Sequence, residues 1–178
     1  SINSTWDIQN GSFTEFSGTG NQNVPSIPGS SSIPFGTSSN FYGYLTISGS
    51  GNKFMFVAGI YNIANDLNIV TSSGVPILNS NNNTIRMLGG NWYNYNTSGF
   101  DEGLGTVIFL GTITQTINCP GGERYFRLTF SKQFSSTLQF NCPINVIQLL
   151  TWTTDGPIFL NSNRLTIESG AVTAMVNS

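Results

Sequence analysis

The sequence of 178 residues contains no histidine, only two cysteines and only 14 charged side chains. No charged residue occurs between Glu15 and Lys53 or between Lys132 and Asp155. Histidine is the usual proton carrier at neutral pH and a frequent zinc ligand, so its absence excludes Ser-His-Asp and Cys-His catalysis and most catalytic zinc sites. We therefore expect a protein that is not an enzyme and that needs no cofactor.

The eight acidic residues leave glycoside hydrolysis formally open, because that reaction needs only two carboxylates facing one sugar. Asp101 and Glu102 are adjacent, however, and on a strand they would point to opposite faces. The other acids occur near expected turns or strand ends, where solvated side chains are common. The sequence predicts no catalytic residue and no metal ligand.

The low content of basic residues excludes two classes of partner. The formal net charge is −2, whereas nucleic-acid and membrane-surface binding require clustered Lys and Arg. Arg124, Arg127 and Lys132 come closest to a cluster, and we expect Arg124 and Arg127 to face solvent from a strand. No apolar run approaches the roughly 20 residues of a membrane span. The chain begins with Ser1, which we interpret as a mature, secreted form whose leader was removed; the predicted location is extracellular.

The two cysteines, Cys119 and Cys142, lie in matching Asn-Cys-Pro triplets at the ends of an expected strand-turn-strand segment. In a secreted protein such a pair predicts a disulfide, which would contribute about 3 kcal/mol. The alternatives are two buried free thiols in a reducing compartment, or a metal site that would need two further ligands.

The chain has the pattern of one all-β domain with three parts. Residues 1–16 form a short strand-like arm, residues 17–40 a Gly/Ser/Pro-rich connector, and residues 41–178 the body. About ten short apolar runs, including residues 106–117, are separated by turn residues, and we find no internal repeat of fixed period. This pattern predicts a β-sandwich, Ig-like or jelly-roll-like, with an extended N-terminal arm.

The surface of such a body would be neutral, with Asn, Ser and Thr providing its solubility. Four asparagines occur in the glycan-acceptor pattern and are predicted glycosylation sites: Asn3, Asn10, Asn82 and Asn96. The run Trp92, Tyr93 and Tyr95 combines aromatic faces with neighbouring amides, as sugar-binding loops do. The alternative is that Trp92 and Tyr95 close the end of the sandwich.

The N-terminal arm suggests how copies of the chain could join. An open sheet edge accepts an extra strand, so an arm inserted into the next subunit would join copies head to tail. Trp6 and Ile8 are spaced to fill pockets on one face and are the predicted anchors of this donor strand. Because such a contact need not close, it would build a filament, and the expected partners are copies of the chain itself.

In its overall plan the chain resembles the subunits of extracellular archaeal thread filaments, pili whose β-sandwich subunits donate an N-terminal strand. The shared features are the arm, several glycan-acceptor sites, two cysteines and few charges. The resemblance implies a filament subunit that supports surface adhesion. Two alternatives remain open: a viral capsid, spike or fibre-head domain, and a cell-surface carbohydrate-binding adhesin that binds glycans through Trp92, Tyr93 and Tyr95.

Overall fold

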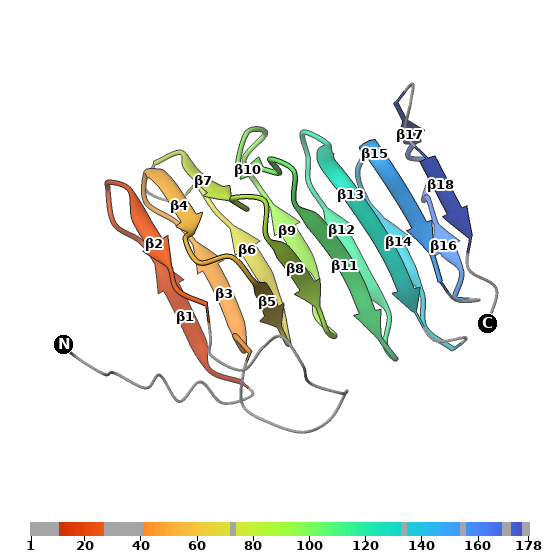
Figure 1. Ribbon diagram of the computed structural model, residues 1–178, viewed down its shortest axis with the longest axis horizontal. Helices are drawn as coiled ribbons and strands as arrows, with labels where there is room; N and C mark the ends of the chain where they lie inside the picture. The colour runs from red at the N-terminus through yellow and green to blue at the C-terminus, as the bar shows by residue number, and fades with distance from the viewer. Residues whose placement is uncertain are drawn as a thin grey trace.

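The computed structural model describes residues 11–26, 41–71, 74–132, 135–153 and 156–168, together with the backbone of residues 172–175. Every regular element in these residues is a β-strand, and Figure 1 shows the strands side by side along the long axis of the molecule. In the described part of the chain, no helix has the length and apolar character of a membrane span.

The strands form three sheets. Sheet 1 contains, in spatial order, β1 (Phe13–Phe16), β3 (Tyr44–Ile47), β6 (Leu67–Ile69), β9 (Trp92–Asn94), β12 (Gln115–Asn118), β14 (Leu138–Phe140) and β16 (Ile158–Phe159). Sheet 2 contains β2 (Gln22–Val24), β4 (Gly51–Met55), β7 (Pro76–Asn79) and β10 (Phe100–Asp101). Sheet 3 contains β5 (Ile60–Ile63), β8 (Thr84–Met87), β11 (Thr106–Gly111), β13 (Glu123–Lys132), β15 (Ile144–Trp152) and β17 (Leu165–Ile167), and β18 (Val172–Met175) also pairs with β15.

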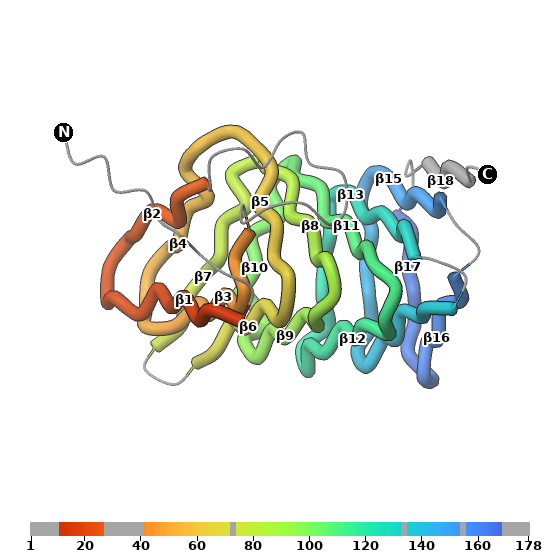
Figure 2. Tube along the Cα trace, turned by 90° about the horizontal axis from the view of Figure 1, so that it is seen from below, coloured from red at the N-terminus to blue at the C-terminus, as the bar shows by residue number. Residues whose placement is uncertain are grey.

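The chain winds as a parallel β-solenoid of about five turns. All pairings within the three sheets are parallel, and neighbouring strands belong to successive turns of the chain. Along sheet 1, Leu45 pairs with Leu67, Leu67 with Trp92, and Trp92 with Ile117. These partners are 22, 25 and 25 residues apart. Figure 2 shows the resulting circuits around one axis.

The predicted β-sandwich is therefore wrong, although the all-β class is confirmed. A sandwich packs two antiparallel sheets, whereas here successive turns of the chain add parallel strands to the same sheets. Short strands with alternating burial and Gly/Asn/Ser corners occur in both architectures. The alternation shows which side chains of a strand face the core, but it does not show which other strand pairs with it. The expectation of no internal repeat is also wrong for the structure, because strands recur at similar positions on each turn.

The core consists of apolar side chains stacked along the axis. Leu45, Leu67, Trp92, Ile117 and Phe140 occupy one rung position of sheet 1 on five successive turns, and each is 0% exposed. Every second residue of each short strand points inward and adds to such a column. Each turn therefore buries its apolar face against the turns before and after it.

Two lysines lie inside the solenoid. Lys53 is 0% exposed, and its Nζ donates hydrogen bonds to the carbonyl oxygens of Gly18 (3.0 Å) and Ser50 (2.6 Å). Lys132 is 1% exposed and donates to Gln115 Oε1 at 2.6 Å. Burial lowers the pKa of Lys53 and lowers that of Lys132 to about 8. Lys132 thus belongs to the interior and adds no charge to a basic surface.

The expected arm and connector contain strands of the solenoid. Phe13–Phe16 is β1 and pairs in parallel with β3. Gln22–Val24, within the expected connector, is β2 and pairs with β4. The predicted anchors Trp6 and Ile8 lie outside the described residues.

Sheet 2 ends before the other two sheets. The turns that contain β4, β7 and β10 have three sides, one in each sheet. After β12 the chain passes directly into β13 through the tight turn 119–122, without a strand in sheet 2. In this turn the Gly122 amide donates to the Cys119 carbonyl at 2.7 Å. β14 is likewise joined to β15 by a short corner. The cross-section therefore narrows from three sides to two after β10, which leaves a step on the surface.

Candidate functional site

A groove of about 630 Å³ lies at this step. Its wall is the last strand of sheet 2 with the flanking corners, and its floor consists of corners of the narrower turns and of residues at the beginnings of β13, β15 and β17. The lining residues are Thr97, Ser98, 100–102, 121–124, 143–145, Arg164 and Thr166. The groove therefore crosses several turns in the direction of the solenoid axis.

The wall of the groove carries backbone hydrogen-bonding groups. β10 pairs with β7 alone among the described strands, and the carbonyls of Gly99 and Asp101 accept from the amides of Leu78 and Ser80. Alternate residues of a parallel strand direct their N–H and C=O groups to opposite sides. The backbone of Phe100 consequently points away from β7, toward the groove.

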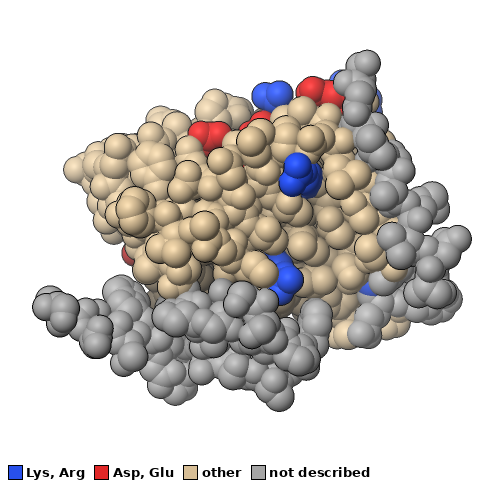
Figure 3. Space-filling model, viewed as in Figure 1, with Lys and Arg blue, Asp and Glu red and all other residues tan. Residues whose placement is uncertain are grey.

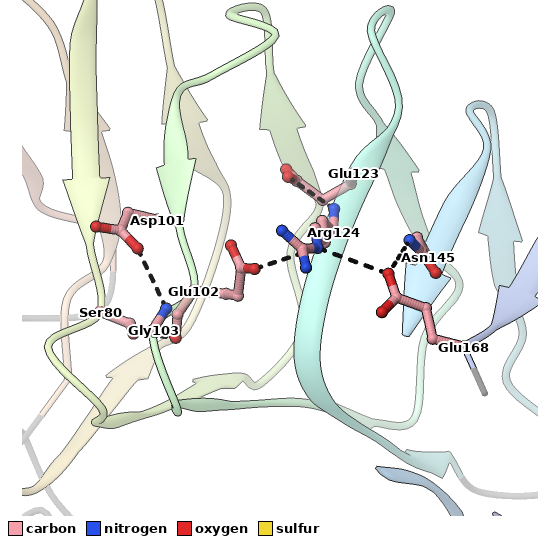
Figure 4. Close-up of polar contacts among 8 residues, drawn as sticks. All are labelled: Ser80, Asp101, Glu102, Gly103, Glu123, Arg124, Asn145 and Glu168. Carbon is pink, nitrogen blue, oxygen red and sulfur yellow. Dashed lines mark hydrogen bonds and ion pairs between the residues drawn. The ribbon is translucent and has the colours of Figure 1, made fainter. Parts of the chain in front are cut away.

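Arg124 occupies the centre of the polar row shown in Figure 4. Its Nε lies 3.5 Å from Glu102 Oε1 and 3.9 Å from Glu168 Oε1. Asn145 Nδ2 donates to the same oxygen of Glu168 at 2.7 Å. The Arg124 side chain is 57% exposed, so these ion pairs contribute little to stability. They hold a guanidinium in a defined position with donors still directed to solvent.

The register of sheet 3 extends this row along the axis. Arg124 pairs with Asn145, and Asn145 pairs with Thr166. Parallel neighbours are about 4.8 Å apart, so a guanidinium, an amide and a hydroxyl follow one another at that spacing. Asp101 lies on the opposite wall, where its carboxylate accepts from Asn79 Nδ2 at 2.6 Å. The groove thus offers both hydrogen-bond donors and acceptors.

Glu123 lies beneath the groove with its carboxylate in the core. The residue is 8% exposed, and its Oε2 accepts from Trp92 Nε1 at 2.8 Å and from Asn94 Nδ2 at 2.9 Å. Cys119 Sγ is 3.4 Å from the same oxygen. Burial raises the pKa of Glu123 to about 7, and the hydrogen bonds from Asn94, Trp92 and Cys119 oppose that rise.

The surface is otherwise nearly free of charge. Figure 3 shows several acidic and basic side chains along the upper edge of one face and a few basic side chains lower on that face, while most of it is uncharged. Among the described residues, no group of three or more His, Cys, Asp or Glu side chains could hold a metal ion. The groove is therefore the place where ionised side chains and hydrogen-bonding groups converge.

The predicted sugar-binding run divides between core and surface. Trp92 is 0% exposed and packs edge-on against Phe100 and Tyr125, with centroid distances of 4.9 and 5.6 Å. It cannot stack on a sugar. Tyr93 and Tyr95 point outward from sheet 1 with parallel rings 6.0 Å apart, and Tyr95 is 48% exposed. The alternative that Tyr95 closes the end of a sandwich is also wrong, because the fold is a solenoid and has no such end.

Two predicted glycosylation sites can be located. Asn82 is exposed in a turn with φ of 64°, and its Oδ1 accepts from the Leu104 amide at 2.7 Å. Asn96 is only 8% exposed, and its Nδ2 donates to the Pro76 carbonyl at 2.9 Å. The burial of Asn96 leaves no room for a glycan on that nitrogen, so Asn82 has the accessible side chain and Asn96 does not. Asn3 and Asn10 lie outside the described residues.

The structure places Cys119 and Cys142 together as two buried free thiols. They do not frame a hairpin as expected: they lie at corresponding corners of successive turns, each two residues beyond the paired residues Ile117 and Phe140. The disulfide between them stays a prediction.

The residues of the groove were not predicted as a set. The sequence indicates solvated side chains for Asp101 and Glu102 and a solvent-facing side chain for Arg124, and the exposure of Arg124 confirms the last of these. Only the stacking of turns brings Glu102, Arg124 and Glu168 together from positions far apart in the chain. The one available signal was the matched Asn-Cys-Pro triplets, since each precedes a strand that lines the groove.

Comparison of the chain with protein-family models, with curated proteins and with solved structures finds no match.

Proposed function

We propose that this chain is a non-catalytic, extracellular glycan-binding solenoid, and that a glycan strand lies in the groove along the solenoid axis. The observation that carries the proposal is the row of a guanidinium, an amide and a hydroxyl at Arg124, Asn145 and Thr166, on three successive turns. Each sugar hydroxyl is both a donor and an acceptor, so a lining of mixed donors and acceptors suits a polyhydroxylated chain.

The charge of the groove favours a neutral ligand over a polyanion. Arg124 is flanked by Glu102 and Glu168, Asp101 lies on the opposite wall, and Arg164 is the second arginine of the lining, so cations and carboxylates are both present. A chain of phosphates would meet these carboxylates and would gain little counterion release from so few cations. A neutral glycan needs no compensating charge and can hydrogen-bond to both the arginine and the acids.

Replacement of Arg124 tests the proposal. Arg124→Ala should weaken binding on an array of neutral glycans about tenfold or more, because hydrogen bonds to charged groups contribute about 1.5–3 kcal/mol each. Arg127→Ala is the matched control: it removes the same charge from the same strand, but Arg127 bonds to Gln148 and does not line the groove. The absence of any binding by the unaltered chain, or equal losses in both variants, would overturn the proposal.

A second candidate function, the subunit of an extracellular filament, is favoured by the end of sheet 1. β1 is the outermost strand of that sheet in the described residues. Its Phe13 is 80% exposed while it stacks on Tyr44 with ring centroids 4.4 Å apart. An outermost strand can accept a strand of another copy, and contact between unlike ends need not close. Donation of the segment that holds Trp6 and Ile8 is one form of such a contact.

Electron microscopy tests this second candidate. Phe13→Arg should abolish filaments, because it places a charge at the end of the solenoid. Phe56→Arg is the control, since Phe56 is 63% exposed in the corner between β4 and β5, away from the end strand. Single particles in preparations of the unaltered chain would contradict the filament proposal without affecting the groove.

A further inference from the structure

The two cysteines lie at equivalent positions of successive turns. Ile117 pairs with Phe140, and each cysteine follows its strand by the same number of residues, so Cys119 and Cys142 are neighbours across one rung. Adjacent parallel strands are about 4.8 Å apart, which lies within the Cα separation of roughly 4.4–6.8 Å that a disulfide spans. The backbone therefore needs no large movement for the two sulfurs to bond.

The thiols also have the hydrogen-bonding environment of a reactive pair. They are in contact with each other, and the hydrogen bond from Cys119 lowers the pKa of Cys142. Burial raises the pKa of Cys119, whose Sγ lies 3.4 Å from Glu123 Oε2. Glu123 is thus the nearest base to the Cys119 proton, and Cys142 is the better nucleophile of the two.

We propose that Cys119 and Cys142 are a redox site, at which a small disulfide such as oxidised glutathione, acting while the chain folds and before the thiols are buried, converts them into a crosslink between successive turns beneath the groove. The Cys142 thiolate attacks one glutathione sulfur and releases the first glutathione thiolate, which leaves a mixed disulfide. Cys119 then loses its proton to Glu123 and attacks the Cys142 sulfur, which releases the second glutathione. Two cysteine thiols are oxidised and one glutathione disulfide is reduced.

The crosslink would act on the floor of the groove and on Glu123. The turn 119–122 and the corner at Pro143 both line the groove, so a bond between them fixes the spacing of two groove-lining corners. Oxidation also removes the Cys119 S–H donor that favours the ionised carboxylate of Glu123. The titratable groups that face this carboxylate are Cys119, Cys142 and Tyr125. The proposal does not depend on glycan binding.

The test compares the full chain refolded from denaturant with oxidised glutathione and with a reducing dithiol. The oxidised sample should lose the mass of two hydrogen atoms, contain no thiol that reacts with an alkylating reagent in denaturant, and remain monomeric by non-reducing electrophoresis. Its Tm should be higher by about 6–12 °C, as expected when a loop of this length is closed in a chain of this size. Because oxidation removes a donor to the Glu123 carboxylate, the pH range over which the free energy of unfolding decreases should extend to higher pH in the oxidised sample than in the reduced one.

A variant without one of the thiols is the matched control. Cys142→Ser, refolded in the same oxidant, should show neither the loss of two hydrogen atoms nor the gain in Tm. Two alkylatable thiols after oxidative refolding, a chain that carries only glutathione adducts, or a crosslink between two chains would each overturn the proposal. A crosslinked chain whose Tm equals that of the reduced chain would overturn the claim that the native rung accommodates the bond.

Discussion

Raising the pH from 4.5 to above 7 should lower the free energy of unfolding by about 3 kcal/mol through Glu123 alone. Burial raises the pKa of this carboxyl from 4.5 to about 7 in the folded chain. Between these values the folded state binds more protons than the unfolded state, so the stabilisation is complete below pH 4.5 and is lost as the pH rises through 7. Urea unfolding at a series of pH values measures this slope directly.

Glu123→Gln should flatten that pH dependence, because the amide does not titrate. Its carbonyl oxygen can still accept from Trp92 and Asn94, which both bond to one oxygen of Glu123. The pKa of Lys132 is lowered to about 8. Its contribution to the free energy of unfolding therefore changes only above about pH 7, and there it rises with pH, whereas that of Glu123 falls. If the variant kept the slope of the unaltered chain, Glu123 would not be the buried acid that the structure shows.

Trp92→Ala should destabilise the chain by about 3–5 kcal/mol, the cost of removing a buried tryptophan. Trp92 is 0% exposed, packs against Phe100 and Tyr125, and donates to Glu123. Its loss would leave a cavity and would remove one of the donors to a buried carboxylate. Thermal unfolding should show a lower Tm by roughly 6–20 °C at neutral pH.

Tyr95→Ala is the matched control for this prediction. Tyr95 follows the same strand but is 48% exposed, so its removal should change the free energy of unfolding by no more than about 0.5 kcal/mol. A stable Trp92→Ala variant with unchanged Tm would place the tryptophan at the surface and would restore its assignment to a sugar-binding loop.

The all-β class could be predicted because alternating apolar runs and Gly/Asn/Ser corners are local signals. The winding into a solenoid could not be predicted. Parallel pairing joins residues more than 20 positions apart, and it leaves the local pattern of each strand unchanged. Residues 106–117 appeared as one strand, whereas β11 and β12 are separate strands in different sheets. A corner of three residues between two apolar strands is too short to stand out.

The repeat was present in the sequence at one place. The two Asn-Cys-Pro triplets are 23 residues apart, which is the offset between β12 and β14 in sheet 1. Two occurrences do not establish a period, and the core column of Leu, Leu, Trp, Ile and Phe shares only its apolar character. The solenoid repeats a shape, and different side chains fill that shape on each turn.

The groove could not be predicted for a related reason. Its residues come from separate turns and become neighbours only where sheet 2 stops, after β10. Arg124 and Asn145 are 21 residues apart, and neither belongs to a local motif. Residues assigned to chemistry by local composition, such as Trp92, proved to be core residues.

Amide chemical shifts recorded during titration with a soluble neutral oligosaccharide selected on the array test the central claim most directly. Glycan binding at the step predicts shift changes that cluster at Thr97, Phe100, Arg124, Asn145 and Thr166, and little change at Tyr93 and Tyr95 on sheet 1. Changes centred on Tyr93 and Tyr95, or none in the residues that line the groove, would contradict it.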